Sequence, residues 1–281
     1  MREVCVITGA AGGMGLAAAK IVGQDRLVVV SDVNPRRLEA ASAELQTLGI
    51  DCVAVDCDVT DRSSVTELFA AAATSGSVTS VIHTAGVSPS MGDAEYILRI
   101  NALGTVHVNE AFLPLASEGF AIVNVASMAA HLFPRLFIPK RRFKDALSNE
   151  DRFMARMTAA CKRVPTGIRP GLAYSISKNF VMWYSASQAA RFGSRGARIV
   201  SVSPGSIDTE MGRLEERAGS GAMVKIAALK RFGKPEEVAE VLAFCASTKP
   251  GYLTGVDIAC DGGVLAAFTL KNMIPLAASN T

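Results

Sequence analysis

The sequence has little of what marks metalloproteins and secreted proteins. It contains only three histidines in 281 residues. Its six cysteines are dispersed and form no pair of Cys-x-x-Cys units, which excludes the common zinc-site patterns. We therefore expect no metal site and a set of reduced thiols, as in a cytoplasmic protein.

Long hydrophobic runs and a strong excess of one charge are also missing. No apolar stretch reaches the ~18 residues of a membrane-spanning helix, and the first run, residues 4–7, leads straight into a glycine-rich turn that leaves no room for a signal sequence. The formal net charge of +3 is too small to predict nucleic-acid binding. We expect a soluble, cytoplasmic protein without a nucleic-acid partner.

Short apolar runs alternate with longer helical patterns along the chain. The runs are Val4–Ile7, Leu27–Val30, Cys52–Val55, Val78–Ile82, Ala121–Val125, Ile199–Val202 and Val256–Ile258. The helical patterns include Gly15–Val22, Arg36–Leu48, Ser63–Ala73 and Glu95–Ala116. Continuously apolar strands suit a sheet buried on both faces, and parallel neighbours need helical crossovers. The sequence therefore predicts one α/β domain, residues 1–281, with a doubly wound, Rossmann-type parallel sheet of seven strands and helices on both faces.

The turn after the first expected strand is rich in glycine. Glycines permit a tight turn and let backbone N–H groups approach a pyrophosphate at the positive end of the following helix. Residues 13–18 fit the G-x-G-x-x-A dinucleotide fingerprint, and Asp32 closes the second strand 19 residues after Gly13. The cofactor-binding residues expected in this turn are Gly9, Gly12, Gly13, Met14 and Gly15.

Asp32 indicates which dinucleotide binds. A carboxylate accepts hydrogen bonds from ribose hydroxyls but repels the 2′-phosphate of NADP, and neither Ala11 nor Gly12 supplies a compensating cation. We therefore expect the cofactor to be NAD. Arg36 and Arg37 could turn toward a phosphate, but at the start of a helix we expect them to form a solvated face.

Tyr174 and Lys178 are the expected chemical centre. Their i, i+4 spacing puts both on one face of a helix. A tyrosine with a pKa near ~10 is a poor base, but a nearby ammonium group and an oxidised nicotinamide both favour the phenolate. Tyr174 would then exchange a proton with an alcohol or ketone while hydride is transferred. Ser127, at the end of the fifth strand, would hydrogen-bond the reacting oxygen.

At these residues the chain resembles the short-chain dehydrogenase/reductase family over nearly its whole length. The matching motifs occur in family order, from the turn at residues 8–15 to C-terminal signatures at residues 231–239 and 253–263. The resemblance implies a catalytic tetrad of Asn101, Ser127, Tyr174 and Lys178, with Asn101 holding a water that links Lys178 to solvent. It further implies cofactor contacts at Asp58, Val59, Ala85, Gly86, Tyr174, Lys178, Pro204, Gly205, Ile207 and Thr209.

The chain departs from the family pattern in two places. His83 and Thr84 stand where two asparagines are usual, which puts in doubt the side-chain contacts that brace the sheet there. Tyr174 follows Ser127 by 47 residues, a spacing much longer than in the family, which indicates an inserted segment at 131–170. Both ends of this segment adjoin catalytic groups, so we expect a largely helical lid that sets substrate specificity and is mobile when no substrate completes its small core.

The inserted segment has ten basic residues against three acidic ones, together with several Phe, Leu and Met residues. One interpretation is an amphipathic lid whose cations face water. The alternatives are a basic rim for an anionic substrate such as an acyl thioester of coenzyme A, contact with an anionic membrane surface, and an altered subunit interface.

The expected function is NAD-dependent interconversion of a secondary alcohol and a ketone, with a hydroxysteroid-like or other bulky apolar substrate as one candidate. A ketoacyl reductase of lipid metabolism and a non-catalytic, NAD-binding regulatory protein are the alternatives. Asp32 argues against the first, which usually draws on NADPH, and the intact tetrad argues against the second. The resemblance also implies a homotetramer, with a dimer as the alternative, that pairs helices 95–116 and 171–192 across a two-fold axis.

Overall fold

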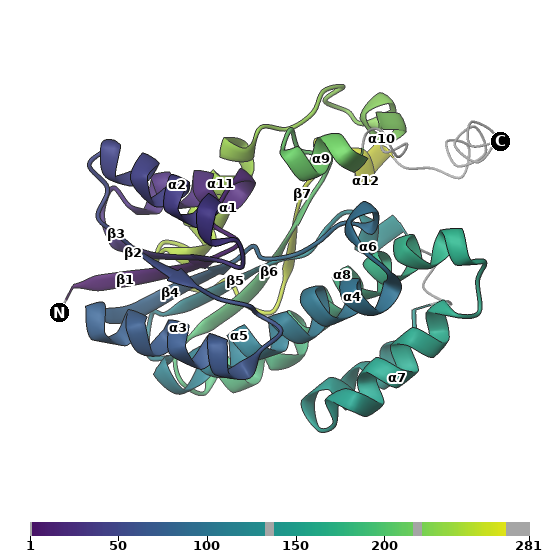
Figure 1. Ribbon diagram of the computed structural model, residues 1–281, viewed down its shortest axis with the longest axis horizontal. Helices are drawn as coiled ribbons and strands as arrows, with labels where there is room; N and C mark the ends of the chain where they lie inside the picture. Colours follow the sequence, from purple (N-terminus) through teal and green to yellow (C-terminus); the bar gives the residue numbers. More distant parts are fainter. Residues whose placement is uncertain (1, 133–137, 216–220, 268–281) are drawn as a thin grey trace.

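A seven-stranded parallel sheet forms the centre of the computed structural model, which describes residues 2–132, 138–215 and 221–267 (Figure 1). The strand order is β3-β2-β1-β4-β5-β6-β7, and every neighbouring pair is parallel. The strands are β1 Glu3–Thr8, β2 Leu27–Asp32, β3 Cys52–Asp56, β4 Ser77–His83, β5 Ala121–Val125, β6 Arg198–Pro204 and β7 Asp257–Cys260. The predicted doubly wound sheet is therefore confirmed, and each expected run lies within or overlaps a strand.

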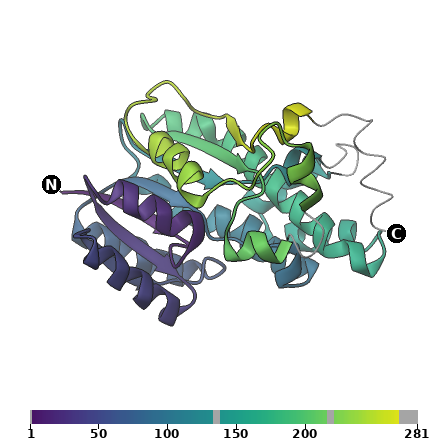
Figure 2. The same ribbon diagram turned by 90° about the horizontal axis from the view of Figure 1, so that it is seen from above.

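Helices cover both faces of the sheet. The α-helices are α1 Gly13–Val22, α2 Pro35–Thr47, α3 Arg62–Ser75, α4 Ala94–Leu98, α5 Gly104–Phe112, α6 Ala129–Leu132, α7 Glu150–Cys161, α8 Arg169–Gly193, α9 Glu210–Glu215, α10 Gly221–Ile226, α11 Pro235–Ala246 and α12 Val264–Ala267. The 3₁₀ segments are η1 Pro89–Met91, η3 Leu113–Leu115, η5 Lys140–Leu147 and η6 Thr166–Ile168. Helices α1, α2 and α11 pack on one face, and α3, α5 and α8 pack on the other. Figure 1 shows these layers above and below the sheet, and in Figure 2, seen from above, the first helix (purple) lies in front of the sheet.

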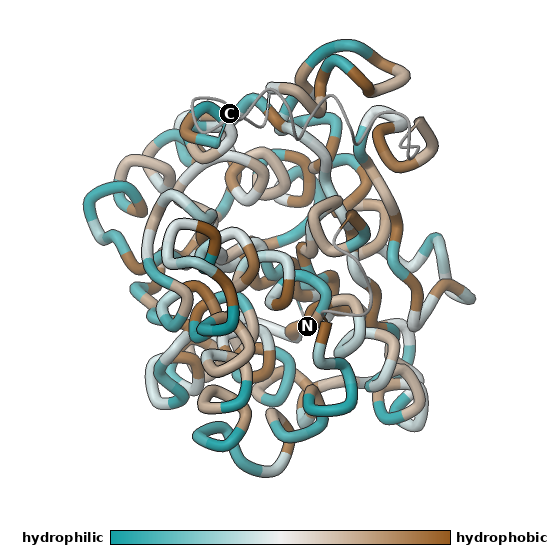
Figure 3. Tube along the Cα trace, turned by 90° about the vertical axis from the view of Figure 1, so that its right-hand side faces the viewer, coloured by the Kyte–Doolittle hydropathy of each residue, from teal (hydrophilic) through white to brown (hydrophobic). Residues whose placement is uncertain are grey.

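Two separate apolar cores follow from this arrangement. Successive side chains of a strand point to opposite faces, so β2 sends Val29 toward α3 and α5 and its neighbours Val28 and Val30 toward α1 and α11. All three valines are fully buried. In Figure 3 the hydrophilic parts of the chain gather at the outer turns of the helices.

The expected helix 95–116 is interrupted. Between α4 and α5 the chain forms a π-helical turn, η2 Arg99–Leu103, and the run ends in the 3₁₀ turn η3, which contains Pro114. A π turn inserts an extra residue into the helix and often occurs at functional sites. Here it contains Asn101, which is buried.

The described part of the inserted segment is largely helical, as expected, but it does not depend on a substrate for burial. Helix α7 packs against α4 and α8, which lie between it and the sheet (Figure 1). Phe143 and Phe153 are fully buried in the same core as Phe180 of α8. The expectation of a partial core that waits for a bound substrate is therefore wrong, because these rings already have a complete apolar environment. Phe133 and Phe137 lie outside the described residues.

The cations of the described inserted segment mostly face water. Residues 140–142 and Lys144 of η5 are exposed, in agreement with an amphipathic segment. Two further cations, Arg152 and Arg156, form ion pairs with the buried carboxylate of Asp145. Within the described part of the chain, no helix is long and apolar enough to cross a membrane.

Candidate active site

The glycine-rich turn after β1 lies against the loop that follows β4. A Cβ atom on Gly9 would stand 2.7 Å from the backbone of Ala85, and one on Gly15 would stand 2.5 Å from the carbonyl oxygen of Gly9. Gly9 and Gly13 also have φ angles of 68° and 54°, which glycine adopts without strain. The turn thus holds its shape only with glycine, and it leads directly into α1, whose first N–H groups lack helical partners.

Asp32 ends β2 beside this turn. Its Oδ2 accepts a hydrogen bond from the backbone of Ala11 at 3.4 Å, and its Oδ1 accepts one from the backbone of Asn34 at 3.0 Å. A carboxylate has about four acceptor positions, so further ones are left for ribose hydroxyls. Asp32 therefore lies beside the glycine-rich turn, and its contact with a ribose stays a prediction.

Arg37 stands over the same turn, and the expectation that it belongs to a solvated face is incomplete. Its Nη2 lies 3.1 Å from the Cβ position of Gly12 and 3.1 Å from Oε2 of Glu210 in α9. The Arg37 side chain therefore extends from α2 past Gly12 of the glycine-rich turn and reaches α9. Both partners of this ion pair are largely exposed.

The other expected cofactor residues lie along the same edge of the sheet. Thr209 contacts the turn, because its Cγ2 lies 3.3 Å from the Cβ position of Gly13. Gly205, just after Pro204 at the end of β6, has no room for a side chain beside Asp261.

Val59 is buried against Gly104, while Asp58 caps its own turn through Thr60. Met14 and Ile207 pack in the core on the α1 and α11 side. These backbone cradles fit a dinucleotide.

The unusual residues after β4 still brace the sheet. Thr8 Oγ1 and His83 Nδ1 are 2.7 Å apart, and Thr84 Oγ1 donates to the carbonyl of Thr8 at 2.7 Å. Burial, together with the charge of Lys178, lowers the pKa of His83 to about 3, so this imidazole is neutral. No group of three potential metal ligands occurs among the described residues.

Asn101 and Lys178 converge on Gly86. The Oδ1 of Asn101 accepts from the backbone of Val87 at 2.8 Å, and its Nδ2 donates to the Val87 carbonyl at 3.0 Å and to Ser177 Oγ at 3.2 Å. A Cβ on Gly86 would lie 3.0 Å from Asn101 Oδ1 and 3.3 Å from Lys178 Nζ. The side chain of Asn101 therefore fixes the loop after β4 and helix α8 around Lys178. The water that it is expected to hold stays a prediction.

Tyr174 and Ser127 meet at the end of β5. The Ser127 side chain is near enough to lower the pKa of the Tyr174 phenol, and Lys178 Nζ lies 5.9 Å from the centre of the Tyr174 ring. Lys178 also donates to the carbonyl of Val125 at 2.9 Å. The structure thus brings together all four expected catalytic residues.

Three effects set the pKa of Tyr174 in the protein alone. Burial raises it, the Ser127 side chain lowers it in part, and the charge of Glu215 raises it again. Burial also lowers the pKa of Lys178 to about 8, so at pH 7 this group is still mainly an ammonium. Without a cofactor the neutral phenol is therefore favoured, and the expected combined effect of Lys178 and an oxidised nicotinamide on the phenolate stays a prediction.

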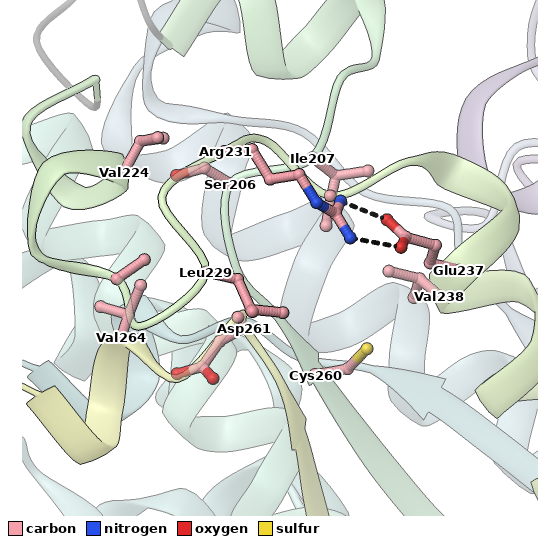
Figure 4. Close-up of a pocket in the computed structure, with 13 residues that line it drawn as sticks. Ser206, Ile207, Val224, Leu229, Arg231, Glu237, Val238, Cys260, Asp261 and Val264 are labelled. Atoms are coloured by element: carbon pink, nitrogen blue, oxygen red, sulfur yellow. Dashed lines mark hydrogen bonds and ion pairs between the residues drawn. The ribbon is translucent and has the colours of Figure 1, made fainter.

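A hollow of about 110 Å³ lies next to the site (Figure 4). It is lined mainly by apolar side chains such as Val224, Leu229 and Val264, and Arg231 is turned away from its centre to pair with Glu237. Of the expected cofactor residues only Ile207 lines it. The hollow therefore lies beside the loop that follows β6 and is separate from the expected dinucleotide site.

Two polar contacts near the site had no recognisable sequence signal. Arg37 pairs with Glu210, and Ser90 pairs with Glu215. In both pairs the residues are far apart in the sequence, and neither carboxylate belongs to a motif. Only the folding of α9 over the sheet edge brings them to the site.

A parallel α/β sheet with a glycine cradle and a Tyr-Lys-Ser-Asn constellation defines an oxidoreductase that binds a nicotinamide dinucleotide. Comparison with known families agrees: residues 3–137 match the model described as short chain dehydrogenase, and residues 154–265 match the model described as enoyl-(acyl carrier protein) reductase. The chain belongs to the short-chain dehydrogenase/reductase family.

Individual relatives match nearly the whole chain. It is 31% identical to short-chain dehydrogenase/reductase bsc3 of Alternaria brassicicola, across 94% of this chain and 96% of the relative. It is 30% identical to D-threitol dehydrogenase of Mycolicibacterium smegmatis, across 96% of this chain and 94% of the relative. The structure of a single-site variant of actinorhodin polyketide ketoreductase with NADPH is similar in fold, with a TM-score of 0.74 at 20% identity over 94% of this chain and 97% of that one.

Proposed function

We propose that this protein transfers hydride between NAD and a secondary alcohol or ketone, with Tyr174 as the acid and base. The observation that carries the proposal is that Lys178 lies beside Tyr174 at the carboxyl end of β5: its Nζ is 5.9 Å from the centre of the Tyr174 ring and donates to the carbonyl of Val125 at 2.9 Å, two residues before Ser127. Ligands of open parallel sheets bind at this edge. A bound nicotinamide would supply the hydride acceptor or donor.

The side chains divide the proton chemistry between them. Ser127 is placed to donate a hydrogen bond to the reacting oxygen, and Tyr174 exchanges the proton of that oxygen. Because burial raises the pKa of Tyr174, the phenol is protonated at neutral pH and is ready to act as the acid in ketone reduction. Alcohol oxidation needs the phenolate, so its rate should rise as the pH rises.

Replacing Tyr174 with Phe tests the proposal. The ring is kept and the hydroxyl is lost, so kcat should fall by about 10²–10⁴-fold while NAD affinity changes little. Tyr96→Phe, at an exposed position on α4, is the matched control and should keep the parent rate. Reduced-nicotinamide absorbance gives kcat, and cofactor titration gives the affinity. A Tyr174→Phe enzyme that turns over a validated substrate at the parent rate would refute the assignment.

We infer a preference for NAD over NADP from Asp32, whose charge repels a 2′-phosphate. Arg37 works against this preference, because its guanidinium stands over the turn and can exchange Glu210 for a phosphate. A ketoreductase of similar fold was solved with NADPH, which makes NADP the alternative cofactor to test. Titration of the purified protein with both cofactors decides: equal or tighter NADP binding contradicts the inference, and Arg37→Ala then identifies the residue responsible.

A ketoacyl reductase is the second candidate function. A relative described as 3-oxoacyl-[acyl-carrier-protein] reductase, from Thermotoga maritima and 28% identical over 94% of this chain, favours it, as does the likeness in fold to a polyketide ketoreductase. Adding 3-ketoacyl thioesters to the substrate panel compares the two candidates directly. A regulatory protein that binds NAD without turnover would oxidise or reduce no member of the panel.

We also infer that the substrate is a small molecule and that the protein assembles as a homo-oligomer. The tetramer expected from the sequence pairs helices 95–116 and 171–192 between subunits. Helix α7 packs against α4 and α8, so the inserted segment covers part of the surface of these helices. A cytoplasmic location stays a prediction.

A further inference from the structure

A hydrogen bond crosses the space in front of the catalytic tyrosine. Ser90, in η1 after β4, donates from its Oγ to Oε1 of Glu215, the last residue of α9, at 2.8 Å. Helix α9 follows β6, and β5 lies between β4 and β6 in the sheet. The bond therefore passes over the carboxyl end of β5, where Ser127 and Tyr174 meet.

The carboxylate of Glu215 faces this space with part of its capacity unused. It is close enough to Tyr174 for its negative charge to raise the pKa of the phenol. Among residues 2–132, 138–215 and 221–267, no cation forms an ion pair with Glu215, and its Oε2 makes no hydrogen bond. A half-buried carboxylate thus has a free acceptor oxygen at the edge of the sheet where Ser127 and Tyr174 lie.

The walls of this space differ in polarity. On the β4 side, the buried Ser88 lies with its Oγ 3.0 Å from Ser90 Oγ and extends the polar contact. On the other side, Met128, the residue after Ser127, packs in a small apolar cluster with Ala227 and Val264. A substrate between these walls meets acceptors on one flank and apolar surface on the other.

Building on the proposed function, we propose that Glu215 is a specificity-determining residue that accepts a hydrogen bond from a second hydroxyl beside the reacting carbinol. The preferred substrates are then vicinal diols and their hydroxyketones. Ser90 acts as a positioning residue that holds the carboxylate over the site.

The discrimination follows from desolvation. When a substrate closes the site, water leaves the carboxylate, and a neighbouring hydroxyl replaces the lost hydrogen bond. An alcohol with a methylene in that place leaves a charged acceptor unpaired, and a site built to bond a hydroxyl rejects such an analogue. A carboxylate group on the substrate would be repelled by Glu215.

Butane-2,3-diol and butan-2-ol provide a matched pair of probes, since they share one carbon skeleton and differ by the second hydroxyl. We expect kcat/KM to be larger for the diol by at least about tenfold, because hydrogen bonds to charged groups are among the strongest in proteins. Equal kcat/KM values would overturn the proposal. A preference for 3-aminobutan-2-ol over the diol would also overturn it, since the site would then select a cation.

Glu215→Gln keeps the size of the side chain and removes its charge. The diol preference should fall at least about fivefold, mainly through KM of the diol, because the charge-assisted bond is lost. Glu67→Gln, on the exposed face of α3, is the control and should keep the wild-type preference. An unchanged preference in Glu215→Gln would overturn the proposal.

The pH profile of the same variant is a second readout. Because the charge of Glu215 raises the pKa of Tyr174, the midpoint of the pH-rate profile for butan-2-ol oxidation should move to lower pH in Glu215→Gln. An unmoved midpoint would contradict the position given to Glu215.

Binding measurements separate this proposal from the proposed function. In a Tyr174→Phe background, calorimetric titration of the NAD complex should give tighter binding of the diol than of butan-2-ol, by at least about threefold, and Glu215→Gln should abolish the difference. If the wild-type enzyme turns over neither alcohol but this difference is present, the proposed chemistry fails and the recognition by Glu215 stands. If turnover occurs without the difference, the recognition alone fails.

Discussion

The glycine-rich turn and the inserted segment 131–170 are held in place by different physical means. In the turn, the constraint lies on the backbone: the chain passes so close to Ala85 and to itself that Gly9 and Gly15 have no room for a Cβ atom. In the inserted segment, the constraint lies on side chains, with Phe143, Phe153 and Met157 fully buried in the core. Backbone constraints restrict the residue type far more than apolar packing does, since volume-conserving apolar exchanges are tolerated.

This difference explains why the sequence identifies one region and misleads about the other. Only glycine satisfies the turn, so its sequence pattern identifies it. Many apolar residues fill a core, so the composition of the inserted segment indicates burial but not the surface on which it occurs.

Removing an inserted aromatic ring should destabilise the whole domain. Phe153 lies 5.0 Å from Phe180 between ring centres and belongs to the main core. Phe153→Ala should therefore lower the free energy of unfolding by about 3–5 kcal/mol through lost burial and a remaining cavity. Urea denaturation measures this, with Leu147→Ala as a control at an exposed position of η5. A loss as small as that of the control would mean that the inserted segment is a separate lid.

Filling the turn should mainly affect the cofactor. A Cβ on Gly15 meets the Gly9 carbonyl at 2.5 Å, so Gly15→Ala must displace the turn at a cost of about 1–3 kcal/mol. If the displacement falls on the bound state, NAD affinity drops by about tenfold or more. Gly193→Ala, at the end of α8 with open space around it, is the control. Unchanged NAD binding in Gly15→Ala would show that the turn does not cradle the dinucleotide.

The sheet and the position of Tyr174 beside Lys178 were predictable because each depends on short-range patterns, whereas Asn101 was expected only from the family resemblance. Apolar runs define strands buried on both faces, and the i, i+4 spacing defines the shared helix face of Tyr174 and Lys178. The raised pKa of Tyr174 was not predictable, since it depends on how deeply the ring is buried and on Glu215, which lies 41 residues away in the chain. The Ser90 contact with Glu215 likewise arises only from the sheet order.

A polar contact between the inserted segment and the domain should contribute least. Glu150, at the start of α7, accepts hydrogen bonds from Arg62 of α3 and from His107 of α5, the latter at 3.1 Å. The other ring nitrogen of His107 lies 2.9 Å from the Val59 carbonyl. Glu150 thereby links the inserted segment to two helices of the domain.

The sign of its pH dependence follows from the pKa of Glu150. Burial alone raises this pKa, but the hydrogen bond from Arg62 and the charges of His107 and Arg62 outweigh burial, so the pKa lies below its ordinary value of 4.5. A carboxyl with a lowered pKa in the folded state stabilises the fold above its unfolded pKa and loses this contribution as the pH falls through the folded value. Because the contact is partly exposed, Glu150→Gln should cost no more than about 1 kcal/mol at pH 7. Urea denaturation of both proteins should give curves that differ at pH 7 and converge as the pH falls below 4.5. A difference that persists or grows in acid would mean that the contact of α7 with the domain does not depend on this charge, and that apolar packing alone holds the inserted segment.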